Sequence, residues 1–322
     1  MAYSEAVLSR ARQRLAQAKA EREAENTRHL SLAYTRFPRL QEIDRQLSAT
    51  VAQAVAASFR RGEDPLPVIA GLREENLALQ RERQRYLDQL EEGYLDGGPV
   101  CALCGGSGYI GSQMCECLSE LCRQEQKKEL TSLLTSANAR FDQFRLDVYP
   151  DTYNEEYGCS PRQMMRLILG RCQRYAMQFT PDSGNMLFSG NPGLGKTFLS
   201  ACIARTVADR GYSVVYETAI KMFADFEAAK FGDPGDTSRT DKYLKCDLLI
   251  IDDLGSEMIT QLSMASLYTV VNTRMMENLS TIISTNLTRD ALGAKYSPAI
   301  ASRVLGMYPL MQFLGNDLRK SE

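Results

Sequence analysis

The sequence predicts an α/β protein: a parallel sheet flanked by helices, preceded by a helical N-terminal domain and a small cysteine module. Three observations carry this prediction. From about Phe141 onward, short apolar segments alternate with amphipathic ones, which is typical of a parallel α/β sheet. Before about residue 95, apolar residues recur at helical spacing. Between these two regions, two close pairs of cysteines stand in a turn-rich stretch.

The N-terminal region is expected to consist of three helices with solvated faces. The second runs from about Arg39 to Arg60, residues Gly62–Pro67 break the pattern, and the third runs from Val68 to about Tyr94. The apolar face of the first helix comprises Val7, Leu8, Ala11, Leu15 and Ala18, and that of the third comprises Leu72, Leu79, Tyr86, Leu90 and Tyr94. Met1–Val100 carries 15 Lys or Arg and 15 Asp or Glu, an interleaving typical of solvated helices. Because so small a helical module has little core of its own, we expect residues 1–95 to expose a partner-binding face.

Charge and composition exclude several classes of protein. The formal net charge is −2, so any contact with nucleic acid must be local, weak and salt-sensitive. We find no run of about 18 apolar residues and no secretion signal, so we expect a cytoplasmic protein without membrane contact. The single histidine, His29, excludes a His-rich metal site and is expected at the surface.

The cysteine pairs Cys101-Ala-Leu-Cys104 and Cys115-Glu-Cys117 have the spacing of a structural zinc site. Gly105, Gly106 and Gly108 leave the loop free to turn backbone amides toward sulfur. A redox dithiol would not need the second pair, and disulfides are not expected in the cytosol. A closed Cys₄ shell leaves no open position for catalysis by Zn²⁺. Replacement of Cys117 by Cys122 as the fourth ligand stays open.

A linking helix follows the cysteines, and the predicted sheet comes after it. A helix is expected from Leu118 to about Ser136. The expected strands are Asn185–Phe188, Ser213–Tyr216, Asp247–Ile251 and Thr281–Ser284, and the expected helices between them are Thr197–Arg210, Ala219–Lys230 and Met264–Met276. In this order they predict βα units and therefore parallel strands.

The segment from Gly190 to Thr197 has the spacing of a phosphate-binding loop, G-x-x-x-x-G-K-[ST]. A strand leads into it and a helix leaves it, so backbone amides and the helix N-terminus converge on phosphate oxygens. Lys196 is expected to reach the β- and γ-phosphates and Thr197 to bind Mg²⁺. The expected nucleotide-binding residues are Gly190, Asn191, Pro192, Gly193, Leu194, Gly195, Lys196, Thr197, Phe198 and Asp252.

Carboxylates and an amide end the later strands. Asp252 and Asp253 follow the apolar run Leu248–Ile251, at the strand end where open α/β sheets bind ligands. We expect Asp252 to hold Mg²⁺ and Asp253 to position and polarise the attacking water. Two interpretations of Asn286 are equally well supported: it contacts phosphate or water, or it forms a turn. From the residues alone, Arg303 is read as a surface ion-pair residue.

Taken together, these motifs resemble the DnaC/DnaI/IstB group of AAA+ ATPases. The resemblance rests on the phosphate-binding loop, Leu248–Glu257, Val271–Arg274, Ile282–Leu287, Ala301–Arg303 and Gly315–Arg319, with Phe141–Phe144 and Tyr149 as the entry segment. It covers residues 95–322 specifically. The cysteine module after a helical N-terminus is similar to the DnaI-type helicase loaders, whereas IstB-type transposition helpers lack it.

The resemblance implies an ATPase whose Arg303 acts as an arginine finger on a neighbouring subunit's ATP and whose Asn286 is the polar sensor. It implies a helical domain (1–95) that holds a hexameric replicative helicase, a zinc module with linker helix (96–135) and an ATPase domain (136–322) that touches single-stranded DNA. It also implies ATP-dependent self-association and a missing helical lid after Arg319. Relatives often carry an arginine where this chain has Ala299, which weakens the expectation of coupling between subunits. An IstB-like transposition helper and a zinc- and nucleotide-binding switch with negligible turnover stay open.

Overall fold

The computed structural model describes residues 3–58, 66–90, 94–95, 97–133, 139–231 and 238–318. By its contacts the chain forms two compact units. One comprises residues 13–117, and the other comprises the first twelve residues together with the chain from Leu118 onward. The functional division into 1–95, 96–135 and 136–322 stays a prediction. No helix in these ranges is both long and apolar enough to cross a membrane.

The unit of residues 13–117 is built from helices and a small β-hairpin. Its helices are most of α1 (Glu5–Arg36), all of α2 (Pro38–Ser58) and all of α3 (Leu66–Leu87). Strands β1 (Tyr109–Ile110) and β2 (Gln113–Met114) pair antiparallel. Helices α2 and α3 pack against each other as a hairpin, with Leu40, Ile43 and Leu79 buried. Two ion pairs, Arg39–Glu82 and Arg83–Asp44, link α2 and α3 at their edges.

Two expectations for this unit were wrong. Helix α3 ends at Leu87 rather than near Tyr94, so Leu90 and Tyr94 do not continue its apolar face. Tyr94 instead stacks on His29 of α1, with ring centroids 4.5 Å apart. The Nδ1 of His29 lies 2.9 Å from the carbonyl oxygen of Tyr94, so His29 is a half-buried packing residue and not a free surface side chain. A contact between segments so distant in sequence leaves no trace in the periodicity of either one.

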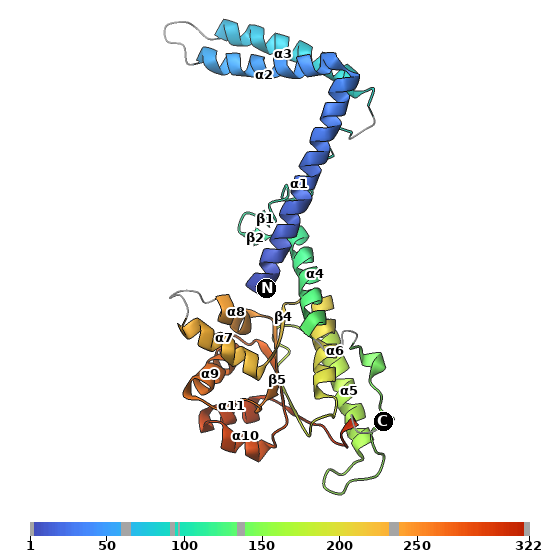
Figure 1. The fold of residues 1–322 in the computed structure, drawn as a ribbon, viewed down its shortest axis with the longest axis vertical. Coiled ribbons are helices and arrows are strands. Elements are labelled where there is room, and N and C mark those ends of the chain that lie inside the picture. Colours follow the sequence, from blue (N-terminus) through green and yellow to red (C-terminus); the bar gives the residue numbers. More distant parts are fainter. Residues whose placement is uncertain are drawn as a thin grey trace. The chain divides into compact units, whose positions relative to one another are not determined.

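The second unit is the predicted parallel α/β fold (Figure 1). Its five strands are β3 (Met186–Ser189), β4 (Val214–Thr218), β5 (Leu248–Leu254), β6 (Ser280–Thr285) and β7 (Leu310–Gln312). They lie in the order β4-β5-β6-β3-β7, and every pair is parallel. Strand β6 therefore lies between β3, which leads into the phosphate-binding loop, and β5, which ends in the two aspartates.

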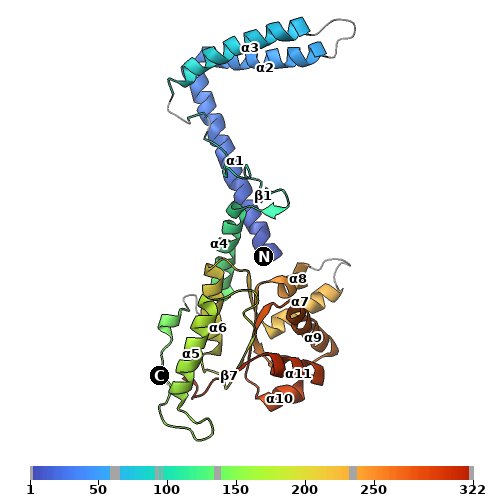
Figure 2. The same cartoon turned by 180° about the vertical axis from the view of Figure 1, so that it is seen from behind.

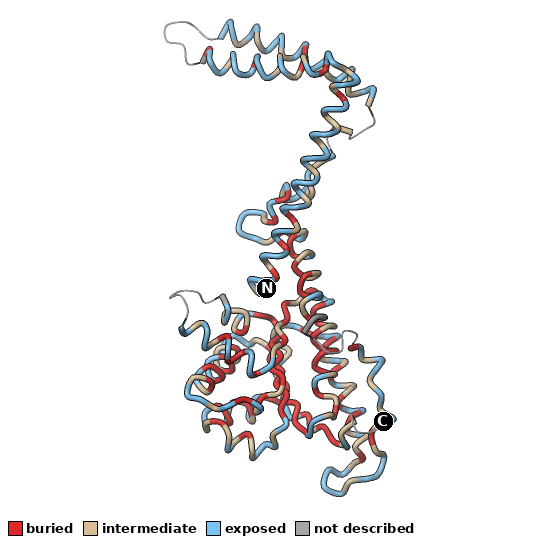
Figure 3. The backbone as a smooth tube through the Cα atoms, in the orientation of Figure 1, coloured by how far each residue is buried: buried red, intermediate tan, exposed pale blue. Residues whose placement is uncertain are grey.

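Helices cover both faces of this sheet (Figures 1 and 2). Helices α5 (Pro161–Met177) and α6 (Lys196–Asp209) lie on one face. The other face is covered by α7 (Ala219–Phe231), α9 (Gln261–Met276), α10 (Arg289–Lys295) and α11 (Pro298–Met307), with α8 (Ser238–Lys245) packed beside them. Successive strand residues alternate between the two cores: Ile250 packs toward α6, and Ile251 packs toward α7 and α9. Figure 3 shows the burial concentrated along these strands.

The predicted strands and helices of this unit are confirmed to within a few residues. The linker helix α4 (Glu116–Leu133) begins two residues earlier than expected, and residues 134–136 of the prediction lie outside the described residues. The elements that the sequence analysis did not name are the short 3₁₀ helix Phe141–Gln143 and α5, α8, α10, α11 and β7. Between β7 and Leu318 the described chain contains no α-helix of a lid, and Arg319 lies outside the described residues.

Candidate functional site

The phosphate-binding loop connects β3 to α6 at the carboxyl edge of the sheet. Strand β3 ends at Ser189, and α6 begins at Lys196. Gly193 and Gly195 have φ angles of 77° and 85°, in the left-handed region that favours glycine. Gly195 caps α6 without a side-chain hydrogen bond, so the first amides of the helix face the loop. Such amides and the helix dipole form an anion site.

Other segments pack closely around the loop. A Cβ at Gly190 would lie 2.5 Å from the carbonyl oxygen of Phe313, and one at Gly193 would lie 1.8 Å from an Asp317 carboxylate oxygen. Tyr149 donates its hydroxyl to the carbonyl of Leu194 at 3.0 Å. Because the atom that a Cβ at Gly190 would meet belongs to the backbone, a larger side chain there would push the loop away from Phe313. The loop is held in shape from outside, which preorganises its amides for a ligand.

The remaining predicted loop residues occupy different environments. Leu194 is buried in the core, and Asn191 and Pro192 are exposed. Phe198 is half-buried, and its ring lies 6.0 Å from that of Phe144. Phe198 thus packs against the entry segment of the domain.

Lys196 is buried, and its ammonium group bridges the phosphate-binding loop and the end of β6. Its Nζ donates to the carbonyl oxygens of Gly190 at 2.6 Å and Asn191 at 2.8 Å. A third bond, 2.7 Å long, reaches Oδ1 of Asn286 at the end of β6. Three acceptors therefore satisfy the ammonium group. The same group can exchange them for phosphate oxygens.

The carboxylate of Asp252 lies between the start of α6 and two neighbouring strands. Oδ1 lies 3.4 Å from the hydroxyl of Thr197 and also accepts the hydroxyl of Ser284 on β6. Oδ2 accepts the hydroxyl of Tyr216 on β4 at 2.7 Å. Burial, followed by the charge of Asp252, raises the pKa of Tyr216 far above its ordinary value, so its hydroxyl stays protonated. A hydroxyl and a carboxylate at this separation are the hard oxygen donors that Mg²⁺ prefers.

Asp253 is turned toward Asn286 by an irregularity in the strand. Its φ is 56°, and the pairing of β5 with β6 shifts between Ile251 and Leu254. A bulge of this kind re-aims a side chain at the end of a strand. The amide of Asn286 donates to Oδ1 of Asp253 at 2.7 Å. Asn286 thus contacts both Lys196 and Asp253.

Arg303 lies on α11 and is bound to its own chain. Nε lies 3.1 Å from Oδ1 of Asn272, and Nη2 donates to the hydroxyl of Tyr268 at 3.0 Å, both on α9. The guanidinium also lies over the ring of Tyr268. Its hydrogen bonds in the described chain do not include any residue of the phosphate-binding loop. The structure therefore brings together every predicted catalytic residue except Arg303.

The four cysteines of the module converge. The sulfurs of Cys101, Cys104, Cys115 and Cys117 all lie within 4.8 Å of one another. The Cys104–Cys117 separation is 3.4 Å and the Cys101–Cys115 separation 3.8 Å. Zn²⁺ bonded to four thiolates at about 2.3 Å places its sulfurs about 3.8 Å apart. The observed donor set and spacing therefore fit a zinc ion.

The close approach of these sulfurs shifts the pKa values of the thiols in opposite directions. Desolvation opposes ionisation of Cys104, but bonds from the Gly108 amide, Cys117 and the Gly106 amide outweigh it and lower its pKa to about 6. Desolvation raises the pKa of Cys117, with a further contribution from Cys104. Cys122 is not part of this group of four, and burial raises its pKa to about 11. The geometry favours Cys117 over Cys122 as the fourth sulfur.

Sequence reasoning missed Tyr216 and Ser284 as neighbours of Asp252. The sequence did indicate which face of the sheet each residue occupies, because side chains alternate along a strand and residues two apart share a face. Ile250 and Asp252 face α6, as do Tyr216 on one side and Ser284 on the other. What the sequence lacked was the strand order, which makes β4 and β6 the two neighbours of β5.

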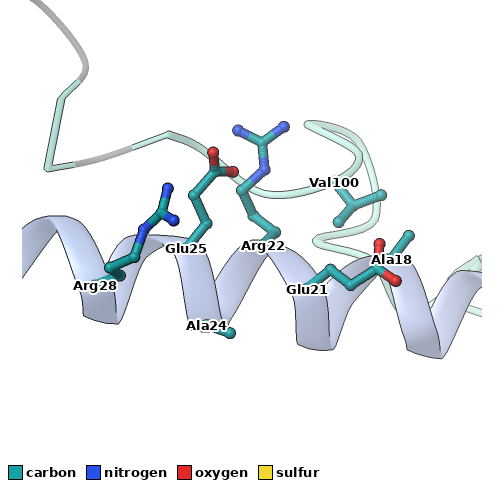
Figure 4. A pocket seen from close by; sticks show the side chains of 7 residues that line it. All are labelled: Ala18, Glu21, Arg22, Ala24, Glu25, Arg28 and Val100. Atoms are coloured by element: carbon teal, nitrogen blue, oxygen red, sulfur yellow. The ribbon is translucent and has the colours of Figure 1, made fainter.

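A separate hollow of about 590 Å³ lies along α1 within the first unit (Figure 4). Glu21, Arg22, Glu25 and Arg28 line it beside Val100. Its two acidic and two basic side chains give no net charge to select a ligand. We assign it no function.

Known proteins resemble part of this chain. A family model described as "IstB-like ATP binding protein" matches residues 150–309. The replicative helicase loader DnaC of Buchnera aphidicola subsp. Schizaphis graminum is 26% identical over 124 residues, which are 38% of this chain and 50% of that protein. The putative insertion sequence ATP-binding protein y4pL of Sinorhizobium fredii is 26% identical over 195 residues, 58% of this chain and 76% of that protein. The chain spans about half the length of several curated relatives it matches.

Among solved structures, a crystal structure of the DnaC helicase loader is 20% identical, with a TM-score of 0.46, over 54% of this chain and 96% of that one. A crystal structure of DnaI is 21% identical, with a TM-score of 0.45, over 60% and 93%. The matched family model and the assembled loop, aspartate and asparagine motifs identify the family. The chain is a member of the DnaC/DnaI/IstB group of AAA+ ATPases, with an ATP-binding P-loop fold.

Proposed function

We propose that this chain hydrolyses ATP to load a hexameric replicative helicase onto single-stranded DNA. The observation that carries the proposal is the combination of a P-loop site with a separate helical unit that bears a four-cysteine cluster. Several matched relatives are named replicative helicase loaders. A loader needs one part that grips the helicase and another that responds to nucleotide, and the two units suit these tasks.

In this proposal the residues of the site have distinct roles. Lys196 leaves Asn286 for the β- and γ-phosphate oxygens, since a phosphate offers stronger charge-assisted bonds than an amide oxygen. Thr197 and Asp252 hold Mg²⁺, which, when bound, neutralises charge on the phosphates. Asp253 orients and polarises the attacking water, and Asn286 fixes the Asp253 carboxylate in position.

Arg303 acts in the proposal on the ATP of a neighbouring subunit. Its bonds to Tyr268 and Asn272 hold it away from its own loop, which is compatible with a role at a subunit interface. An arginine finger supplied by a neighbour contributes about 10³-fold or more to hydrolysis. The loader would therefore assemble when ATP is bound, and it would touch single-stranded DNA weakly because the chain carries no net basic charge.

In this proposal the helical unit contains the helicase-binding surface. On α2, Val51 and Val55 are four residues apart and expose 60% and 55% of their surface. Residues at this spacing share a helix face. An exposed apolar face on a helix suits docking into an apolar groove of a partner. The zinc ion, held by Cys101, Cys104, Cys115 and Cys117, would fix the fold of the loop that follows.

A binding experiment with the full chain tests this proposed helicase-binding surface. Replacing both Val51 and Val55 with Asp places charges in the contact, and burial of an unpaired charge is costly. We expect at least about a tenfold weaker affinity for the hexameric helicase, about 1.4 kcal/mol, measured by calorimetry. The matched control replaces Gln53 and Ala56 with Asp; both are exposed on the same helix, and each lies about 100° or more around its axis from the two valines. Equal affinities for the two double variants would count against the assignment.

One observation favours a second candidate, an IstB-like transposition helper. The matched family model is described as IstB-like, and the relative y4pL is named an insertion sequence protein. That alternative predicts stimulation by a transposase rather than by a helicase. ATP turnover measured with each partner separates them. Turnover unchanged by either partner or by DNA would instead support a nucleotide-binding switch.

A further inference from the structure

Strand β5 carries one residue more than β6 at the end where the site lies. The register of the two strands is regular up to Ile251 and shifts before Leu254. Within this shift, Asp252 and Asp253 stand opposite a single residue of β6, Ser284. Two residues against one is the arrangement of a β-bulge, which interrupts the backbone ladder and re-aims side chains. The bulge therefore brings both aspartates to the same serine.

The side chain of Ser284 is bonded to both aspartates. Its Oγ accepts the backbone N–H of Asp253 at 2.9 Å and donates its own proton to Oδ1 of Asp252. The hydroxyl has one proton to give, so its orientation is fixed by these two bonds. Ser284 exposes only 1% of its surface, and water therefore does not compete effectively for them. One buried hydroxyl joins the backbone of one aspartate to the carboxylate of the other.

The backbone of Asp253 is strained and is held from β6 and the residue that follows it. Its φ of 56° lies in the left-handed region, which costs a residue other than glycine roughly 1 kcal/mol. Such a conformation persists where neighbouring groups hold it. Ser284 holds the N–H of Asp253, and the amide of Asn286 donates to its Oδ1 at 2.7 Å. Asp253 is thus held at its backbone and at its carboxylate.

We propose that Ser284 is a positioning residue for ATP hydrolysis: its hydroxyl keeps the peptide of Asp253 in the strained conformation that aims the carboxylate at Asn286 and at the attacking water. Without the hydroxyl, the N–H of Asp253 loses this acceptor. The backbone then relaxes toward an ordinary φ, and the carboxylate turns away from Asn286. The inference rests on the proposed function, in which Asp253 polarises the water. The phosphate-binding loop binds the nucleotide, so ATP affinity should depend little on Ser284.

Two control variants accompany Ser284→Ala. Ser280 lies at the other end of β6, is fully buried and donates its hydroxyl to a backbone carbonyl oxygen at 2.8 Å. Ser280→Ala therefore removes a buried hydroxyl from the same strand but away from the site. Tyr216→Phe removes a donor to Asp252 and leaves the acceptor of the Asp253 N–H in place. The two controls separate the loss of any buried hydroxyl, and the loss of a donor to Asp252, from the loss of the bond to Asp253.

The first measurement is amide hydrogen exchange of the full chain without nucleotide, resolved at the amide of Asp253. Exchange reports the local opening of a hydrogen bond. Ser284→Ala should accelerate exchange at this amide by about tenfold. Ser280→Ala and Tyr216→Phe should leave it close to the wild-type rate. This result does not depend on ATP turnover.

The second measurement compares ATP turnover, with helicase and single-stranded DNA present, with the affinity for MgATP measured by calorimetry. Ser284→Ala should lower kcat by about tenfold or more, because a small misplacement of a catalytic group is costly. Its affinity for MgATP should stay close to that of the wild type. Ser280→Ala should keep the wild-type kcat, and Tyr216→Phe should retain more turnover than Ser284→Ala.

Four results would overturn the inference. Two are an unchanged exchange rate at Asp253 in Ser284→Ala and an unchanged kcat in that variant. The third is a loss of MgATP affinity as large as the loss of kcat, which would mark a structural role. The fourth is an equal loss of kcat in Tyr216→Phe, which would mean that Ser284 acts through Asp252. A wild type without turnover would overturn the proposed function itself, and the exchange measurement distinguishes that failure because it needs no turnover.

Discussion

Arg274 shows how a single residue joins the elements of the nucleotide unit. It is fully buried on α9. Its guanidinium donates to the carbonyl oxygens of Tyr243, Cys246 and Ser280 and to the hydroxyl of Thr281. These acceptors belong to the end of α8 and the start of β6. A buried charge is tolerated when all its donors are satisfied, and a planar guanidinium can reach several carbonyls at once.

Replacing Arg274 with Lys should therefore destabilise the fold. Lysine has three donors in place of five and lacks the planar fork, so buried carbonyls lose their partners. We expect a loss of about 3 kcal/mol, since each unsatisfied buried polar group costs roughly 1–3 kcal/mol. Denaturant unfolding measures it, with Arg171→Lys on the exposed face of α5 as the control. A change within about 0.5 kcal/mol, the range of ordinary surface substitutions, would mean that the bonds are dispensable.

At the residue scale, the sequence located the main parts of the candidate site but not their contacts. Lys196, Asp252 and Asp253 stand out because their motifs are local in sequence. The sequence could not predict that Asn286 contacts both Lys196 and Asp253. These contacts arise because β6 lies between β3 and β5 in the sheet. Tyr216 was overlooked for the same reason. Strand order is a property of the whole sheet, and no short segment encodes it.

At the element scale, the central strands were predictable because both of their faces are buried. Such strands consist of continuous apolar runs such as Leu248–Ile251. Strand β7 escaped prediction because it has only three residues, Leu310–Gln312. Helix α8 is short and rich in charge, and α10 has only seven residues. Helix α5 was detectable: Ser160 and Gln163 form a capping box, with Pro161 in the first turn.

The cysteine module is the element whose stability should depend on a metal. Strands β1 and β2 are two residues each, too short to fold alone. A structural zinc contributes on the order of 10–16 kcal/mol to a small site. Cys104→Ser should therefore lower the zinc content and unfold the chain around the module, while ATP binding by the other unit persists. Metal analysis and limited proteolysis measure the two effects.

The control for this prediction is Cys159→Ser. Cys159 is half-buried in the nucleotide unit and is not part of the group of four sulfurs. This variant should keep its zinc and its protease resistance. A wild type with clearly less than one zinc per chain after purification in the absence of chelators would contradict a closed Cys₄ site.

At the scale of the whole molecule, we propose nucleotide chemistry for one unit and partner binding for the other. The predicted α/β class is confirmed, including a parallel sheet with helices on both faces. The sequence could not reveal how subunits meet. Arg303 makes its hydrogen bonds with α9 and with its own helix. Its proposed role requires a second copy of the chain, and only an assembled complex can test it.

The most direct test of the central claim is helicase loading onto closed circular single-stranded DNA, measured as DNA-bound helicase per circle. Wild type with MgATP should load helicase. Lys196→Ala, which lacks the phosphate-binding ammonium, and Arg303→Ala, which lacks the finger, should each fail while still binding the helicase. An assembled mixture of the two variants should recover part of the loading, because some interfaces then join an intact site to an intact finger. Loading by Lys196→Ala equal to that by wild type, or independent of ATP, would contradict the account.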